Sequence, residues 1–189
     1  MTGNFYNVLQ RSKDHSEIIS IWNYGDSDGF WSGYVKDFND DMVSIQHFTK
    51  YGKPDGVLIV KMADIKTIDF DDDYSKAMQC VIDYSAELDK EEKFETTLPD
   101  NDFWQFAVLK QVENDSNVIA KVEINGGDHF SGFIENVTES DFLLNCVGSL
   151  GEPEAKAIYK LDDVSAVRVN DIESRKRLML YKWRKATKL

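Results

Sequence analysis

Short runs of alternating apolar and polar residues, separated by turns rich in Gly, Asp, Asn and Pro, make up most of the chain. Alternation with a period of two is typical of half-buried β-strands. The first half contains five predicted strands, at residues 17–24, 30–38, 42–50, 57–60 and 65–70. The second half contains five more, at residues 118–124, 130–137, 142–147, 155–161 and 164–169. The pattern therefore predicts a mainly β protein.

Segments with helical spacing of apolar positions stand before and after each set of strands. These predicted helices cover residues 4–12, 71–90, 100–111 and 171–188. Aspartates at residues 71–73 and at residue 100 would cap two of them, because a carboxylate at a helix N-terminus accepts unpaired backbone N–H groups. The apolar positions of the last segment form no single clean stripe. Each set of strands is thus expected between two short helices.

The sequence pattern of residues 30–42 recurs at residues 129–141. The same offset of 99 residues continues to the end of the strands. It pairs Gly33, Gly52, Pro54 and Lys61 with Gly132, Gly151, Pro153 and Lys160. Chance does not hold one register through an apolar pattern and several turn residues. We infer an internal duplication.

A polar connector at residues 90–98 separates the two copies. We place the domain boundary there and predict one domain at residues 1–93 and another at residues 94–189. Each copy is large enough, at roughly 70–90 residues, to form a small domain with its own core. Hydrophobic residues make up 42% of the chain, which is sufficient for two such cores.

The apolar runs, the first residues and the cysteines of the chain indicate the cellular compartment. No apolar run reaches the ~18 residues of a membrane span, and the first residues lack the features of a secretory signal. Cys80 and Cys146 stand at non-equivalent places in the two copies, so neither a disulfide framework nor a metal site is expected. We predict two buried or half-buried free thiols in a reducing compartment, a cytoplasmic location, and no membrane or cofactor partner.

The charge is strongly negative and unevenly distributed. The chain carries −12 overall, but residues 171–189 hold seven basic and two acidic side chains, a net of +5. The other 170 residues therefore carry −17. A body this acidic repels nucleic acid at long range, which disfavours RNA as a partner. The basic C-terminal segment, with Arg175 and Arg184, is the one place where a local contact could form.

Two short motifs recur in each copy. In the first copy, Gly33, Val35, Phe38 and Met42 lie in one motif, and Val60, Lys61, Ile65 and Ile68 lie in the other. These positions resemble the two motifs of the Sm and Sm-like family. The resemblance implies two tandem, five-stranded, bent-sheet barrels of SH3-like type, each preceded and followed by a short helix. It also implies assembly through the edge strands of the sheets.

The polar positions of the family's RNA-base pocket depart from that pattern. The motif-one Asp is replaced by Asn39 and Thr138, and the motif-two Arg is replaced by Lys61 and Lys160. Lysine cannot reproduce the planar, bidentate donor of arginine. The neighbouring Asn and Gly positions are also lost, to Val43, Phe142, Met62 and Leu161. The resemblance is thus better in structural positions than in RNA-contacting ones.

No catalytic constellation emerges. His15, His47 and His129 stand at unmatched positions, and no metal-ligand spacing or phosphate-binding loop is present. We therefore expect a non-enzymatic protein. Trp31 and Trp104 are expected in the cores of the small barrels.

Two hypotheses on function remain. The first is a binding or scaffold module whose partners are proteins, either another copy or a different chain, paired through sheet edges. The alternative to this assembly is a monomer in which the helices at residues 71–90 and 171–188 cover the sheet edges. The second hypothesis is RNA binding through Asn39, Lys61, Thr138, Lys160, Arg175 and Arg184.

Overall fold

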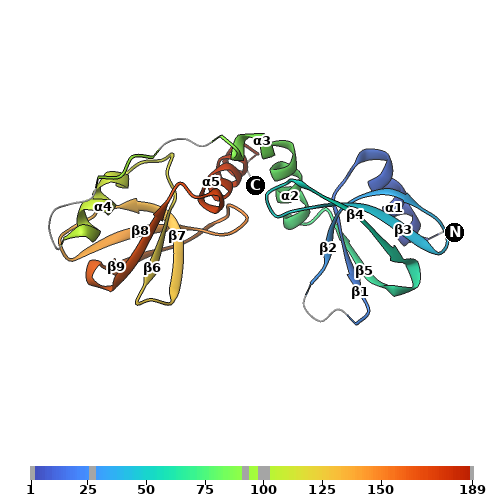
Figure 1. The fold of residues 1–189 in the computed structure, drawn as a ribbon, viewed down its shortest axis with the longest axis horizontal. Coiled ribbons are helices and arrows are strands. Elements are labelled where there is room, and N and C mark those ends of the chain that lie inside the picture. Colours follow the sequence, from blue (N-terminus) through green and yellow to red (C-terminus); the bar gives the residue numbers. More distant parts are fainter. Residues whose placement is uncertain (1–2, 26–28, 91–93, 98–102, 188–189) are drawn as a thin grey trace. The chain divides into compact units, whose positions relative to one another are not determined.

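The computed structural model describes residues 3–25, 29–90, 94–97 and 103–187 (Figure 1). The chain divides into two compact units, Met1–Glu87 and Leu88–Leu189. The sequence places the boundary between residues 93 and 94, and residues 91–93 lie outside the described part. Each unit is built on one five-stranded antiparallel sheet with a few short helices, so the prediction of a mainly β protein is confirmed.

The first unit begins with helix α1 (Asn4–His15), and its sheet has the order β4-β3-β2-β1-β5. Its strands are β1 (Ile19–Asn23), β2 (Trp31–Phe38), β3 (Met42–Phe48), β4 (Pro54–Lys61) and β5 (Ile65–Phe70). A 3₁₀ turn, η1 (Met62–Asp64), joins the last two strands. Helix α2 (Asp73–Asp83) follows, and the short α3 (Ser85–Leu88) spans the boundary between the units.

The second unit repeats this order of elements. Helix α4 (Trp104–Val112) comes first, and α5 (Ile172–Thr187) comes last. The strands are β6 (Ala120–Ile124), β7 (Asp128–Glu135), β8 (Asp141–Val147), β9 (Pro153–Lys160) and β10 (Val164–Val169). A 3₁₀ turn, η2 (Leu161–Asp163), again joins the last two strands. The sheet order, β10-β6-β7-β8-β9, is that of the first unit read from its other edge.

The two units also share hydrogen bonds at positions 99 residues apart. The N–H of Asn39 donates to the carbonyl oxygen of Met42 at 2.9 Å, and that of Thr138 donates to Asp141 at 2.8 Å. Helix α2 is capped by the side chain of Asp72, which accepts from the N–H of Ser75 at 2.7 Å. At the start of α5, Asp171 accepts from Ser174 at the same distance. The offset therefore extends beyond the strands into the helix that follows each sheet.

Gly33 and Gly132 lie in the middle of β2 and β7, where the sequence predicts bending or close packing. A Cβ atom on Gly33 would lie 1.9 Å from the backbone oxygen of Gln46, and one on Gly132 would lie 2.1 Å from that of Asn145. Both distances are far below van der Waals contact. The prediction of close backbone packing at these two glycines is confirmed.

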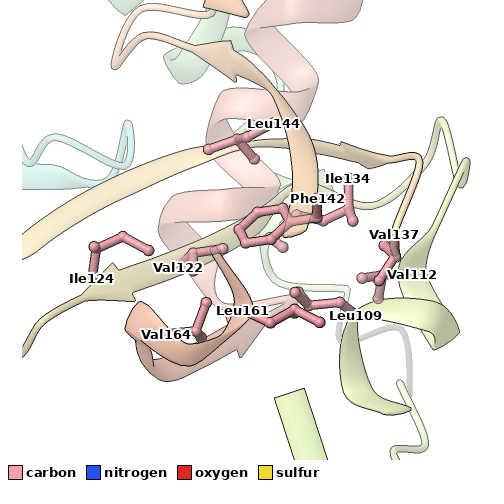
Figure 2. Packing of buried hydrophobic residues seen from close by; sticks show 11 residues of the cluster. Leu109, Val112, Val122, Ile124, Ile134, Val137, Phe142, Leu144, Leu161 and Val164 are labelled. Atoms are coloured by element: carbon pink, nitrogen blue, oxygen red, sulfur yellow. The ribbon is translucent and has the colours of Figure 1, made fainter. Parts of the chain in front are cut away.

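A separate hydrophobic core lies in each unit. In the second unit, Phe142 lies among aliphatic side chains from the strands, α4 and η2, including Val122, Leu109 and Leu161 (Figure 2). In the first unit, the α1 residue Leu9 packs with side chains of all five strands. The alternating apolar positions of the sequence thus identify the core-facing side of the strands.

The sheets differ from closed barrels. In the described part of the chain, β4 and β5 are the outer strands of one sheet, and β9 and β10 are those of the other. The outer strands β4 and β9 also begin earlier than predicted, at Pro54 and Pro153. Proline is tolerated there because the missing N–H falls at the start of an edge strand.

Several other predictions need correction. The helix predicted at residues 71–90 is interrupted at Tyr84, between α2 and α3. Helix α4 begins at Trp104, and the predicted cap Asp100 lies outside the described residues. The side chain of Trp31 is 40% exposed, since it stands at the first position of β2 against the ring of His47 and outside the core. Trp104 is half-buried against the core of the second unit, as expected.

Candidate functional site

The outer strand β4 presents apolar side chains to solvent. Leu58 and Val60 face the core of the first unit. Val57 and Ile59, which alternate with them, are 51% and 61% exposed. A strand at the edge of a sheet also carries unpaired backbone groups along its outer side. The strand therefore combines an available hydrogen-bonding edge with an exposed branched apolar face.

The equivalent strand β9 is apolar at only one of these positions. Ile158 is 73% exposed. Lys156 and Lys160 lie two positions before and two positions after it, on the same side of the strand. Lysines on an edge strand oppose pairing with another strand, because pairing would bury their charge. In β4 the corresponding places are held by Val57, Ile59 and Lys61. The edge of the first unit is thus less protected than that of the second.

The helix after each sheet packs close to the loop that precedes its outer strand. At Gly52, a Cβ atom would lie 2.5 Å from the carbonyl oxygen of Val81 in α2. At Gly151, it would lie 2.5 Å from the carbonyl carbon of Leu180 in α5. In the first unit, α2 contributes Met78 to a cluster with Phe48. Although α2 covers this part of the sheet, the side chains of Val57 and Ile59 stay exposed.

The turn between β2 and β3 brings together two predicted RNA-binding residues. Met42 pairs with Lys61 across β3 and β4, and the N–H of Met62 donates to the carbonyl oxygen of Asp41 at 2.8 Å. The Asn39 side-chain oxygen accepts from the N–H groups of Asp41 and Met42, at 2.9 Å each. Asn39 therefore supports its own turn, while Lys61 is exposed beside it.

The second unit has the same arrangement. Asp141 pairs with Lys160, and the N–H of Leu161 donates to the carbonyl oxygen of Ser140 at 3.0 Å. The hydroxyl oxygen of Thr138 accepts from the N–H groups of Ser140 and Asp141, at 3.2 and 3.1 Å. The structure thus places Asn39 near Lys61 and Thr138 near Lys160.

The arginines of α5 are engaged inside the second unit. Arg184 is 7% exposed, and its Nε donates to the carbonyl oxygen of Leu150 at 2.8 Å. The two terminal nitrogens of Arg175 donate to the carbonyl oxygens of Asn170 and Leu88. Both guanidinium groups therefore bond to backbone oxygens of their own unit. They are not brought to the turns that hold Thr138 and Lys160.

The two cysteines are free, and they are buried and half-buried as predicted. Burial raises the pKa of the Cys80 thiol to about 11, and the nearby charge of Asp83 adds to this effect. The pKa of Cys146 is raised by burial and, to a lesser extent, by Glu154. A thiol with a raised pKa is a poor nucleophile at neutral pH, because little thiolate is present.

A cleft of about 400 Å³ lies beside Cys146 in the second unit, lined by β7, β8 and α5. Its aromatic side is formed by Phe133 and Tyr181, whose ring centroids are 5.0 Å apart.

Among the residues that the structure describes, no three His, Cys, Asp or Glu side chains come together in a way that could hold a metal ion.

Comparisons of the chain with protein-family models, with curated proteins and with solved structures find no match. The Sm-like resemblance therefore depends on the motif residues alone. In the described part of the chain, no helix has the length and apolar character needed to span a membrane.

Two features of these surfaces were missed from the sequence. The continuous apolar run at residues 57–60 predicts a buried strand, and this is wrong for Val57 and Ile59, which are exposed because β4 is an outer strand. Residues 54–56 have the sequence of a loop, because Pro54 and Gly56 are strong turn signals. Pro54 and Pro153, which are separated by the same offset of 99 residues, are a signal for the start of an edge strand, because proline is tolerated there. The bonds from Arg175 to Leu88 and from Arg184 to Leu150 carry no signal in the sequence, since the carbonyl groups lie 87 and 34 residues away along the chain.

Proposed function

We propose that this chain is a non-enzymatic scaffold module, made of two Sm-like units, that assembles with a second copy through the outer strands of its sheets. The observation that carries the proposal is the exposure of Val57 and Ile59 on the outer strand β4. The Sm-like assignment is supported by the shared order of helix, strands and 3₁₀ turn, and by the motif residues that lie at those places.

Pairing of two sheet edges offers a physical reason for assembly. Unpaired N–H and C=O groups of one edge strand bond to those of another, which extends the sheet across the two chains. Burial of the branched side chains beside the edge adds roughly 25 cal/mol for each Å² of apolar surface removed from water. Strand β4 supplies both contributions, whereas β9 carries lysines at two of its outward positions.

The alternative of a monomer with covered edges is less well supported. Helix α2 is the element of the first unit that could cover β4, and it packs against Phe48 and Gly52. The side chains at the middle of β4 are left more than half exposed. A patch of this kind on a sheet edge is typical of an interaction site.

Light scattering after size-exclusion chromatography tests the proposal. The wild-type chain is expected to have at least twice its monomer mass at about 200 µM and to dissociate towards about 1 µM. The double variant Val57→Lys/Ile59→Lys is expected to be monomeric, because pairing would bury two new charges. Glu139→Lys, in an exposed turn, is the control and should assemble like the wild type. A monomeric wild type at every concentration would refute the proposal.

RNA binding is the second candidate. It is favoured by the placement of exposed Lys61 and Lys160 beside the turns of Asn39 and Thr138, where the resemblance locates a base pocket. It is opposed by the acidic side chains in the same turns, Asp40 and Asp41 in one case, which repel phosphate. The engaged guanidinium groups of Arg175 and Arg184 weaken it further.

Titration of a labelled U-rich or A-rich oligonucleotide at low and moderate salt tests this candidate. If RNA binds through the two lysines, Lys61→Met/Lys160→Met should lower the affinity and reduce its dependence on salt. Lys76→Met, at an exposed position of α2, is the control for the loss of positive charge. The absence of binding at low salt would eliminate the candidate.

A further inference from the structure

An apolar groove of about 470 Å³ lies between helix α1 and strand β5 in the first unit. Its walls include Phe5 and Val8 from the helix, and Ile68 and Phe70 from the strand. Phe5 and Phe70 are 45% and 41% exposed, although both are large aromatic residues. Two exposed phenylalanines on one groove of a small domain require an explanation, because exposed apolar surface of this kind is usually covered by a partner.

The second unit shows how the equivalent surface is covered. Leu9 of α1 and Leu109 of α4 are both fully buried in the core of their unit, so the two helices correspond at an offset of 100 residues. Arg11 then corresponds to Gln111. The Gln111 side chain bonds to both backbone groups of Thr97, accepting from its N–H and donating to its oxygen, at 2.9 Å each. The segment at residues 94–97 therefore runs along this face of α4.

Phe94, at the start of that segment, supplies the aromatic group. It is half-buried and packs against the core of the second unit, together with Val167 and Val169 of β10. Val169 corresponds to the exposed Phe70 at the offset of 99 residues. The second unit thus has a phenylalanine-bearing segment that bonds to its first helix and packs against its core, while the first unit exposes aromatic groups on the corresponding helix and strand.

The groove of the first unit has Arg11 at the place that Gln111 occupies in the second unit. The guanidinium of Arg11 is fixed by Glu17 and by Asp71, at 2.9 Å from the latter, and it lies 5.5 Å from the centre of the Phe70 ring. Lys66 lines the strand side of the groove. An arginine has donors but no acceptor, so it bonds only to oxygens such as those of carbonyl and carboxylate groups. A glutamine such as Gln111 has a donor and an acceptor, so it can bond to both the N–H and the C=O of a backbone.

We propose that this groove binds an extended segment of a partner protein, with a phenylalanine that inserts between α1 and β5 and covers Phe5 and Phe70. Glu17 and Asp71 balance the charge of Arg11, so the groove recognises the phenylalanine and the backbone of the segment and does not select an acidic sequence. Residues 89–100 of this chain, which carry Phe94, provide a peptide of this kind. This binding uses the side-chain surface of the first unit and does not depend on the pairing of β4.

Fluorescence anisotropy with a labelled peptide of residues 89–100 tests the proposal on the full chain. The peptide is expected to bind the wild type in the micromolar range, and a peptide with Phe94→Ala should bind at least about tenfold more weakly. In the protein, Phe70→Ser should weaken binding by a similar factor. Tyr24→Ser, at an aromatic residue that is 67% exposed outside the groove, is the matched control and should leave binding unchanged.

Three results would overturn the proposal. The first is no binding at peptide concentrations up to about 1 mM. The second is binding that Phe70→Ser does not weaken, since the peptide would then occupy the covered surface of the second unit. The third is an assembly of the wild-type chain that Phe70→Ser dissociates in the absence of peptide, which would make the groove an interface between copies.

Discussion

Gly52 and Gly151 meet two independent requirements that exclude other residues. Their φ angles are +74° and +78°, in the left-handed region that L-residues with a Cβ rarely adopt. At both positions a Cβ would also lie 2.5 Å from the backbone of the helix that follows the sheet. These glycines therefore set how closely α2 and α5 pack against their units.

We predict that Gly52→Ala destabilises the first unit by about 2–4 kcal/mol, because backbone strain and helix displacement add. Gly56→Ala is the matched control, since Gly56 has a φ of +80° but no atom within 4 Å of a Cβ. It should cost only about 1 kcal/mol. Urea unfolding followed by circular dichroism measures both. Equal losses for the two variants would show that contact with α2 is unimportant.

A carboxylate at the end of α4 makes stability depend on pH. Glu113 accepts from the Lys110 ammonium and from the N–H of Val137, both at 2.7 Å. The bond from Lys110, and then that from Val137, lowers the pKa of Glu113. A lowered folded-state pKa contributes stability that is present above the unfolded value of about 4.3 and is lost as the pH falls through the folded value.

We therefore predict that Glu113→Gln is less stable than the wild type at neutral pH, and that the difference shrinks below about pH 4. Thermal unfolding at a series of pH values measures this difference. Glu139→Gln, at an exposed turn residue, should show no such convergence. A constant difference for Glu113→Gln across the series would mean that the carboxylate charge has no part in it.

At the scale of elements, α5 docks by polar contacts as well as apolar ones. Leu180 is buried, but Arg177 and Arg184 donate to the carbonyl oxygens of Val147 and Leu150 in the loop of Gly151. These bonds join α5 to the end of β8 and to the loop before β9. The basic character of α5 thus has a structural role in the second unit, separate from any role in recognition.

We predict that Arg184→Met destabilises the second unit by about 1–3 kcal/mol, because it leaves the partly buried carbonyl of Leu150 without its charged donor. Lys185→Met, at the adjacent exposed position, should change stability by less than about 0.5 kcal/mol. Differential scanning calorimetry of the two variants compares them. A loss for Lys185→Met equal to that for Arg184→Met would refute a specific docking role for Arg184.

The elements differ in how well the sequence predicts them. Strands such as β3 and β10 follow directly from alternation, because one face of each is buried against a core. Helix α5 has no clean apolar stripe, since arginine-to-carbonyl bonds replace part of that stripe. The beginning of β4 was predicted too late, because proline and glycine at an edge resemble a loop.

At the scale of the whole molecule, the duplication explains most of what the sequence could predict. The offset of 99 residues gives two units with one strand order, and it extends to the caps of α2 and α5. It does not indicate whether the sheets close, because closure depends on twist and on contacts between the first and last strands. The candidate surfaces differ between the units because outward-facing residues diverge more freely than core residues.

The predicted polar site residues illustrate the same limit. The motifs correctly indicate that Asn39 and Lys61 lie close together, because strand pairing brings their turns into contact. They do not indicate that Asn39 is bonded within its own turn or that Arg175 faces backbone oxygens. Which of these residues lie close together follows from the strand topology. Whether their side chains are free to bind a ligand depends on the contacts that they make within the fold.

Hydrogen exchange measured by mass spectrometry at two protein concentrations tests edge-strand assembly most directly, because it reports on backbone N–H groups. If β4 pairs with a second copy, amides within Pro54–Lys61 should exchange more slowly at about 200 µM than at about 1 µM, and Val57→Lys/Ile59→Lys should abolish this difference. Amides of the central strand β2 serve as the reference and should not change. Exchange of β4 that is independent of concentration would contradict the proposed assembly.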